Sequence, residues 1–266
     1  MAVTQSPPDF VVSGAEALLQ VSAVSLSAQR AELMVPAGQR FADPVAGSCR
    51  SALGVPLDDV TGYVVACGAP SGRWPVSLGI RVDFLADIPT AGDPLSVTGE
   101  LIARDDTSGT THGSVVDSDG NVLALVTQRS HLVGVDATPT TPDISFDVPA
   151  ADVPIRAALG FRDLAPGVVE MPPNQLAVNG MGNLHGGVLI IGSELAAMSA
   201  VEAAGDFRTT SIDIAYVRPG NGREATTFGA EVRHSGRSVA VVTVTASNSS
   251  GKPCSIATVV VQRRST

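Results

Sequence analysis

The stretch from Asn179 to Val201, NGMGNLHGGVLIIGSELAAMSAV, combines groups that could do chemistry with an almost wholly apolar run. From Val188 onward, the run predicts a helix that is apolar on every side and therefore buried. Glu194 interrupts it, and burial disfavours an ionised carboxylate unless a partner or a bound water compensates. A structural interpretation is also open: Glu194 reaches past the sheet rim into solvent, and His185-Gly186-Gly187 is a helix-initiating turn.

The polar groups follow the spacing N-x5-HGG-x6-E-x16-S, which covers Asn179, His185 to Gly187, Glu194 and Ser211. Together with the strand SIDIAYVRPG, this spacing resembles PaaI-type acyl-CoA thioesterases of the hotdog superfamily. The resemblance covers residues 161–262 well and the N-terminal half in outline. It implies an α+β fold, in which a curved antiparallel sheet wraps one long helix. It also implies hydrolysis of a thioester to a carboxylic acid and free CoA.

The resemblance implies a role for each residue of the motif. The backbone N–H of Gly186, at the positive end of the helix, would stabilise negative charge on the acyl oxygen. His185 and Asn179 would shape the loop or add a hydrogen bond, although Asn179 could simply cap it. Glu194 would activate water or attack the carbonyl, and Ser211 would hold the water or orient the carboxylate. No metal is required, and coenzyme A enters only as part of the substrate.

The two halves of the chain follow the same pattern. A shift of 136 positions places Asp58 on Glu194 and Cys49 on His185, and the offset falls to about 132 after the helix. In each half, short turns separate alternating or β-branched runs, which predicts antiparallel hairpins. We therefore expect two tandem hotdog folds joined by a linker, with the boundaries 1–135 (degenerate motif), 136–160 (linker) and 161–266 (HGG motif).

The spacing within the helix predicts that one copy is not enough. Gly186 and Glu194 lie eight residues apart, so about 12 Å separates them at ~1.5 Å per residue. Because they cannot act on one carbonyl, each site must pair the loop of one hotdog unit with the acid of another. Within one chain, the Gly186 loop would face Asp58, with Asp59 adjacent.

The second pairing is expected to be unequal to the first. Glu194 and Ser211 would face the N-terminal loop, where Cys49 and Arg50 stand in place of the HGG motif. A long arginine side chain would stand where the family keeps glycine. The site that contains Gly186 and Asp58 is therefore the better candidate for an intact one.

Two alternatives stay open for the acid. Gly54 and Pro56 would disturb a helix, in which case Asp58 and Asp59 form only a surface turn. Alternatively, two chains associate so that one C-terminal half meets another, and Glu194 does the work. Double-hotdog chains could form homo-oligomers of this kind.

A group of basic residues could bind the phosphates of coenzyme A. Arg233, His234 and Arg237 surround a tight turn, and Arg218 lies upstream. In similar proteins this region lies near those phosphates, and arginine suits their geometry. The alternative is a solvated hairpin tip.

Composition bears on the class of protein. The net charge of −9 argues against non-specific nucleic-acid binding. No stretch approaches the ~20 uninterrupted apolar residues of a membrane span, and the first residues lack the pattern of a signal peptide. The three cysteines show no CxxC spacing, so we expect neither disulfides nor zinc sites, and a cytoplasmic location.

Two rival functions remain at this point. One is a non-catalytic acyl-CoA binding module, since half of the site machinery has decayed. The other is a hotdog-fold enoyl-CoA hydratase, whose signature sets a His five positions after an Asp. No Asp in this chain has a His at that spacing. The expected partner is thus a small acyl-CoA substrate, with a thioesterase as the leading interpretation.

Overall fold

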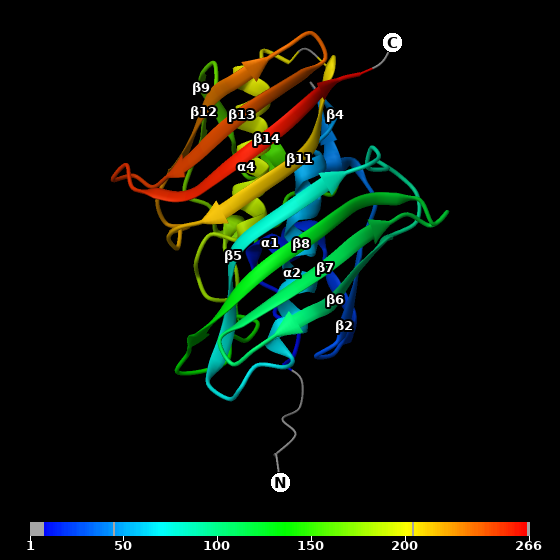
Figure 1. The fold of residues 1–266 in the computed structure, drawn as a ribbon, viewed down its shortest axis with the longest axis vertical. Coiled ribbons are helices and arrows are strands. Elements are labelled where there is room, and N and C mark those ends of the chain that lie inside the picture. The colour runs from blue at the N-terminus through cyan, green and yellow to red at the C-terminus, as the bar shows by residue number, and fades with distance from the viewer. Residues whose placement is uncertain (1–7, 45, 204, 265–266) are drawn as a thin grey trace.

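The computed structural model describes residues 8–44, 46–203 and 205–264. Twelve antiparallel strands form one sheet, with the helices on one of its faces (Figure 1). The strands of the first half are β1 (Ser22–Leu26), β2 (Arg30–Val35), β5 (Arg73–Phe84), β6 (Leu95–Arg104), β7 (Ser108–Val116) and β8 (Val122–Gly134). Those of the second half are β9 (Arg162–Ala165), β10 (Val168–Met171), β11 (Phe207–Tyr216), β12 (Thr226–Ser235), β13 (Val239–Ser247) and β14 (Pro253–Arg263).

Each half wraps its strands around one helix. Helix α2 (Gly54–Ala66) packs against β2, β5, β6, β7 and β8, and α4 (Gly186–Ala200) packs against β10 to β14. Counted outward from the middle of the sheet, the order β5-β8-β7-β6-β2-β1 is repeated as β11-β14-β13-β12-β10-β9. The fold is therefore two tandem hotdog units, as the sequence predicts. The proposed boundaries at residues 135 and 160 stay predictions.

The two units meet along β5 and β11, which pair from Ser211–Asp83 to Ala215–Gly79. Behind this seam, α2 packs against α4. The helices approach closely because glycines stand at the crossing: a Cβ on Gly187 would lie 2.4 Å from the backbone nitrogen of Val55. The first turn of α4 therefore lies beside the first turn of α2.

Asp58 and Asp59 lie in helix α2, not in a surface turn. A short 3-10 helix, η2 (Arg50–Leu53), leads into it, and Gly54 and Pro56 occupy its first turn. A proline is tolerated there because the N–H groups of a first turn have no intrahelical acceptor. The side chains of Asp58 and Asp59 are 13% and 9% exposed. The surface-turn alternative is therefore wrong.

The segment ahead of the first strand, which the predicted boundary 1–135 assigns to the N-terminal unit, contacts both units. Its helix α1 (Gly14–Leu19) lies against η3 (Gln175–Ala177) of the second half. A Cβ on Gly14 would lie 1.9 Å from the carbonyl oxygen of Gln175, so only glycine permits this approach. The remaining short elements are η1 (Gln39–Phe41), β3 (Ala42–Asp43), β4 (Gly47–Ser48) and α3 (Ile155–Ala158).

Most of the buried apolar side chains of both units form a single core that includes residues of α1, α2 and α4. Among the helices that the structure describes, none combines the length and the hydropathy that a bilayer crossing requires.

Candidate active site

The first turn of α4 offers a free backbone donor. His185 is the N-cap, and its Nδ1 accepts the N–H of Gly187 at 3.0 Å. The N–H of Val188 donates to the carbonyl of His185 at 3.0 Å. Within the described part of the chain, the Gly186 N–H has no acceptor. It is therefore available to a ligand at the positive end of the helix.

Asp58 reaches this turn from the other hotdog unit. A Cβ added to Gly186 would lie 2.5 Å from Asp58 Oδ2 and 3.0 Å from the Tyr216 hydroxyl. The Tyr216 hydroxyl donates to the carbonyl of Gly186 at 2.9 Å. A side chain at position 186 would therefore crowd both Asp58 and Tyr216. The carboxylate of Asp58 and the hydroxyl of Tyr216 lie beside the residue whose own N–H is free. The structure places the Gly186 loop against Asp58, in the pairing that the sequence predicts.

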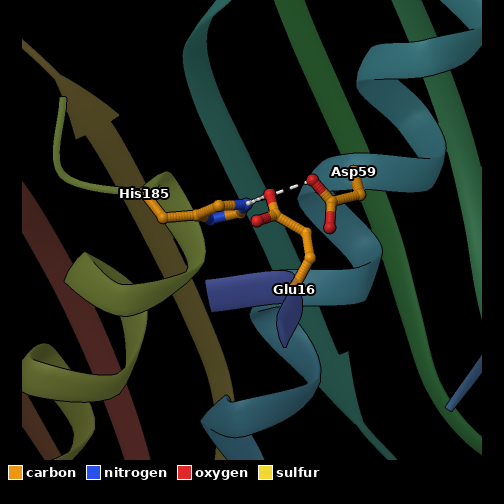
Figure 2. Close-up of side chains that lie close together, drawn as sticks. All are labelled: Glu16, Asp59 and His185. Atoms are coloured by element: carbon orange, nitrogen blue, oxygen red, sulfur yellow. Dashed lines mark hydrogen bonds and ion pairs between the residues drawn. The ribbon is translucent and has the colours of Figure 1, made fainter. Parts of the chain in front are cut away.

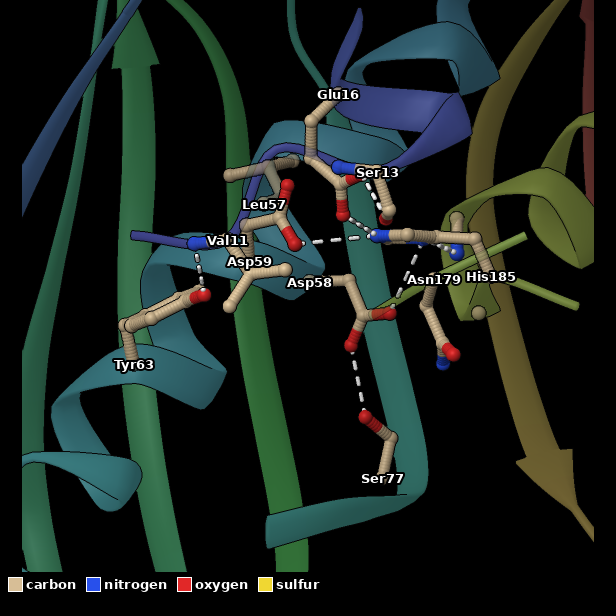
Figure 3. A network of polar contacts seen from close by, with 12 residues as sticks. Val11, Ser13, Glu16, Leu57, Asp58, Asp59, Tyr63, Ser77, Asn179 and His185 are labelled. Atoms are coloured by element: carbon tan, nitrogen blue, oxygen red, sulfur yellow. Dashed lines mark hydrogen bonds and ion pairs between the residues drawn. The ribbon is translucent and has the colours of Figure 1, made fainter. Parts of the chain in front are cut away.

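Two side chains of the first unit hold the other oxygen of Asp58. Oδ1 accepts the Ser77 hydroxyl at 2.7 Å (Figure 3). It also accepts Nε2 of Gln128 at 3.2 Å, and the same Nε2 donates to Ser77 Oγ at 2.8 Å. Because a carboxylate can only accept, the Gln128 amide must face it with the nitrogen. The Thr61 hydroxyl meets the other end of that amide.

Burial sets the electrostatics around Asp58. Burial raises the pKa of Asp58, although the hydrogen bonds from Ser77 and Gln128 oppose the shift. A carboxylate with a raised pKa is a stronger base toward water. Burial also raises the pKa of Tyr216 well above its usual value, so its hydroxyl remains a neutral donor.

Ser77 and Gln128 were missed by sequence reasoning. The offset of about 132 maps Ser211 to Gly79, two positions from Ser77, so a weak signal existed for the serine. Gln128 carries no such signal, since it lies 70 positions from Asp58 and is one polar residue among several on β8.

A cluster of three buried residues, Glu16, Asp59 and His185, lies behind the free donor (Figure 2). His185 Nε2 lies 3.1 Å from Asp59 Oδ1 and 3.3 Å from Glu16 Oε1. Burial raises the pKa of Asp59 to about 7, and the nearby charge of Glu16 adds to this. Burial also tends to raise the pKa of Glu16, but the contacts with His185 and the hydrogen bond from Ser13 together outweigh it and lower that pKa. We call these three residues the His185 cluster.

The tautomer of His185 follows from its contacts. A backbone N–H cannot become an acceptor, so Nδ1, at 3.0 Å from the Gly187 nitrogen, carries no proton. Burial opposes a second proton on the ring, while Asp59 and Glu16 raise the pKa of His185. The fixed Gly187 donor decides the outcome, because a proton on Nδ1 would face it directly. The ring therefore carries its proton on Nε2.

The His185 cluster also has the residue types of a metal site. Three possible ligand atoms, one from each residue, lie within 4.8 Å of one another. With its proton on Nε2, however, the imidazole presents no lone pair to the two carboxylates. The cluster fits a hydrogen-bonded network rather than a metal site.

The free donor and Asp58 open into a cavity of about 490 Å³ at the seam. Both units line it with apolar, aromatic and polar side chains. Its lining includes Tyr63, Trp74, Asn179, Tyr216 and Arg218. A cavity of this volume is in the range of small-molecule sites.

Asn179 lies in the wall of this cavity, as the motif predicts. Its Oδ1 accepts the backbone N–H groups of Met181 at 3.0 Å and Asn183 at 3.2 Å. These bonds fix the loop that leads to His185, which is the loop-shaping role that the sequence allowed for Asn179.

Glu194 lies in a second, smaller cavity of about 180 Å³ on the other side of the seam. Its Oε2 accepts the Ser51 backbone N–H at 3.0 Å and the Ser51 hydroxyl at 2.5 Å, and the Cys49 thiol lies at 3.4 Å. Glu194 thus faces the N-terminal loop, as predicted. Arg50 turns away, with Nη2 at 2.6 Å from Asp87 Oδ1. We call this the second cleft, and the cleft of Gly186 and Asp58 the first cleft.

Ser211 is not brought to either acid in the described chain. It lies on β11, in register with Asp83 and Val260, and no hydrogen bond joins it to Glu194. The hydroxyl that does hold a site carboxylate is that of Ser77.

The four residues expected near coenzyme A phosphates are separated. Arg218 lies two residues after the end of β11 and lines the large cavity. Arg233, His234 and Arg237 lie at the β12–β13 turn, where Val239 pairs with Gln262. Tyr216, beside the cavity, pairs with Ser255 at the opposite end of β14. Only Arg218 is therefore positioned at the first cleft.

Comparison with known proteins agrees with this architecture. Residues 181–255 match the family described as the Thioesterase superfamily. No curated protein matches the chain. A solved structure, the tesB protein MAP1729c of Mycobacterium avium subs paratuberculosis, is similar at 12% identity and a TM-score of 0.67, covering 94% of this chain and 98% of that one.

Two further solved structures show the same likeness. The acyl-CoA thioesterase II TesB2 of Mycobacterium marinum is 11% identical with a TM-score of 0.62, over 94% of this chain and 97% of that one. The 12:0-ACP thioesterase of Umbellularia californica is 13% identical with a TM-score of 0.61, over 88% and 94%. The TM-scores show that these structures share the fold of this chain. At identities this low, the likeness extends to the fold alone.

Proposed function

We propose that the protein is a thioesterase that hydrolyses an acyl-CoA in the first cleft. One observation carries the proposal: a free N–H at the start of α4 lies beside a buried carboxylate from the other unit. Gly186 supplies the donor and Asp58 the acid, and both line a cavity of about 490 Å³. The match of residues 181–255 to the Thioesterase superfamily supports the same reaction class.

The proposed reaction needs only these groups and water. The acyl oxygen lies at the Gly186 N–H, which stabilises the negative charge that develops when water attacks the carbonyl carbon. Asp58 takes a proton from that water, and Ser77 and Gln128 keep the carboxylate oriented. When the C–S bond breaks, Asp58 returns the proton to the leaving sulfur. The products are a carboxylic acid and the free thiol of coenzyme A.

Asp58, rather than Glu194, is the working acid in this proposal. The carboxylate of Glu194 already accepts the Ser51 N–H and hydroxyl in the second cleft. Asp58 Oδ2 faces Gly186, while Oδ1 alone takes the bonds from Ser77 and Gln128. The acid of the first cleft thus has an oxygen directed at the place where substrate would bind.

Coenzyme A is the proposed carrier of the acyl group, with no other cofactor. Arg218 lines the cavity and provides a cation of the kind that pairs with phosphate. Tyr63 and Trp74, whose ring centroids are 5.9 Å apart, provide an aromatic wall for the acyl group. The PaaI subtype, the cytoplasmic location and homo-oligomer formation stay predictions.

An assay of purified protein against acyl-CoA thioesters of varied chain length, with detection of the released thiol, tests this function. We expect steady turnover by the wild type and a loss of kcat of about 10²- to 10⁴-fold in Asp58→Asn. Asp213→Asn, on the exposed face of β11, should leave kcat unchanged. Tight binding without turnover across all thioesters would instead indicate a non-catalytic binding module.

A further inference from the structure

The segment ahead of the first strand places a buried acid behind the proposed oxyanion donor. Glu16 is 3% exposed, and its Oε1 lies 3.3 Å from His185 Nε2. Burying a carboxylate is costly unless specific partners hold it. Nothing in the proposed reaction uses this acid directly, so its burial calls for another explanation.

The His185 ring connects Glu16 to the donor turn (Figure 3). Rotation of the ring by half a turn would replace Nδ1 by a carbon and break its bond with the Gly187 N–H. Only one orientation places Nδ1 on Gly187 and Nε2 between the two carboxylates. Glu16 and Asp59 therefore fix the orientation in which His185 caps α4.

That orientation leaves Gly186 as the free donor. The N–H of Gly187 is taken by the ring and that of Val188 by the His185 carbonyl. Loss of the ring contact would release the Gly187 N–H as a competing donor and let the first turn shift. Displacement of a donor by about 1 Å can cost about a hundredfold in rate.

Glu16 is itself held in place. Its Oε2 accepts the backbone N–H of Ser13 at 3.0 Å and the Ser13 hydroxyl, which closes a capping box on α1. The Ser13 hydroxyl also lies 3.2 Å from the carbonyl of Val178, and the Ala15 N–H donates to that carbonyl at 3.4 Å. The segment is therefore docked on the loop that carries the motif.

We propose that Glu16 is a positioning residue of the active site, which acts through His185 to hold the Gly186 N–H where the acyl oxygen binds. This inference rests on the proposed thioesterase function. It makes the N-terminal segment part of the catalytic unit, although the segment lies outside the strands and helix that form a hotdog fold.

A double-mutant cycle of Glu16→Gln and His185→Asn tests the proposal. Glutamine keeps the size of Glu16 but cannot accept from both Ser13 and His185 with two oxygens. Asparagine at 185 can still cap the helix, but it removes Nε2. We expect Glu16→Gln to lower kcat by about tenfold to a hundredfold with KM within about twofold. In the His185→Asn background, it should change kcat by less than about twofold.

Equal losses in both backgrounds, or an unchanged kcat in Glu16→Gln, would overturn the proposal. Glu170→Gln, which removes an ion-paired carboxylate on β10, serves as the control and should leave kcat and KM unchanged. If Glu16→Gln does not fold, as judged by circular dichroism, Ser13→Ala replaces it. That variant loosens Glu16 and should give a smaller loss of kcat at constant KM; no loss would count against the proposal.

Nitrogen NMR of the His185 ring gives a readout that does not depend on activity. The wild type should show a proton on Nε2 and an accepting Nδ1, and Glu16→Gln should show a mixture of states. The signal is assigned by its loss in His185→Asn. If the wild type hydrolyses no thioester, the proposed function fails and this spectrum alone decides the positioning. A wild-type proton on Nδ1, or an unchanged spectrum in Glu16→Gln, would contradict it.

Discussion

The two clefts of this chain occupy equivalent places in a duplicated fold and differ in what their acids bind. In the second cleft, Glu194 accepts the backbone N–H of Ser51, so acid and donor satisfy each other. In the first cleft, the equivalent N–H, that of Gly187, is taken by His185. Asp58 accepts a hydrogen bond from Ser77 at Oδ1, and its Oδ2 faces Gly186. A site stays open to substrate only when its polar groups have partners other than each other.

The two units also differ in the side chains that the strands beside each acid provide. Bulges at Ser77 in β5 and Thr209 in β11 mark equivalent positions, paired with Ser130 and Val261. Gln128, two residues before Ser130, thus corresponds to Val259, which is fully buried and apolar. The Thr209 hydroxyl is buried without a hydrogen-bond partner among the described residues. Among the described residues, the strands of the second unit therefore give Glu194 no counterpart of the hydrogen bonds that Asp58 accepts from Ser77 and Gln128.

The largest difference between the clefts is the residue at the helix start. Gly186→Ala should lower kcat by about a hundredfold, because its Cβ would lie 2.5 Å from Asp58 Oδ2. Arg50 is tolerated at the equivalent position because its guanidinium turns to Asp87 and to the carbonyl of Thr209. Gly229→Ala, where the added Cβ meets nothing within 4 Å, is the matched control. Thiol-release kinetics that show equal rates for both variants would contradict the assignment of Gly186.

Gln128→Val would make the first cleft resemble the second. We expect kcat to fall by about tenfold, since Asp58 loses the amide that donates at 3.2 Å. Loss of a donor to the carboxylate also raises the pKa of Asp58 further, so the acid limb of the pH–kcat profile should move to higher pH. Thr127→Val, on the exposed side of the same strand, should leave the profile in place. A shift in both variants would argue against a specific role for Gln128.

Glu194→Gln separates stability from catalysis. Replacement of a buried carboxylate that accepts from Ser51 should reduce the free energy of unfolding by about 1–3 kcal/mol. Thioesterase activity should remain within about twofold, because the second cleft takes no part in the proposed reaction. Urea unfolding and the thiol assay measure the two effects. Loss of activity with unchanged stability would favour the alternative in which Glu194 of two associated chains is the acid.

The His185 cluster predicts a smaller effect, on the pH dependence of stability. Asp59 has a pKa of about 7 in the folded chain, against 3.8 for the ordinary side chain. The folded state therefore keeps a proton that the unfolded state has released, and this group lowers stability as pH rises from about 4 to 7. Asp59→Asn should remove that component. The free energy of unfolding of Asp59→Asn, relative to that of the wild type, should therefore rise as pH goes from about 4 to 7. Unfolding measured at several pH values checks this. A difference between the two proteins that does not change with pH would contradict the prediction.

Much of the fold could be predicted from the sequence because its signals are local. Turn residues and alternating apolar residues located the strands from β10 to β14, and the HGG motif located the start of α4. Asp58 followed from a distance argument along one helix and from the internal repeat. A pattern of short period and a duplication are both visible within a single chain.

The missing parts depend on contacts between distant segments. Ser77 and Gln128 meet Asp58 only after β5 and β8 pair, and the polar residues along these strands look alike in sequence. Glu16 lies in a segment whose role appears only when α1 docks against the second unit. The position of Ser211 also depends on such contacts. The β-bulge between Thr209 and Ser211 shifts the register of β11, and this shift cannot be seen in the sequence.

A crystal structure with a non-hydrolysable ketone analogue of an acyl-CoA, in which a methylene group separates the sulfur from the carbonyl, tests the central claim most directly. The account predicts a carbonyl oxygen about 3 Å from the Gly186 nitrogen, with Asp58 within hydrogen-bond reach of the attacking water, and an empty second cleft. A carbonyl bound beside Ser51 and Glu194, or away from both helix starts, would contradict it.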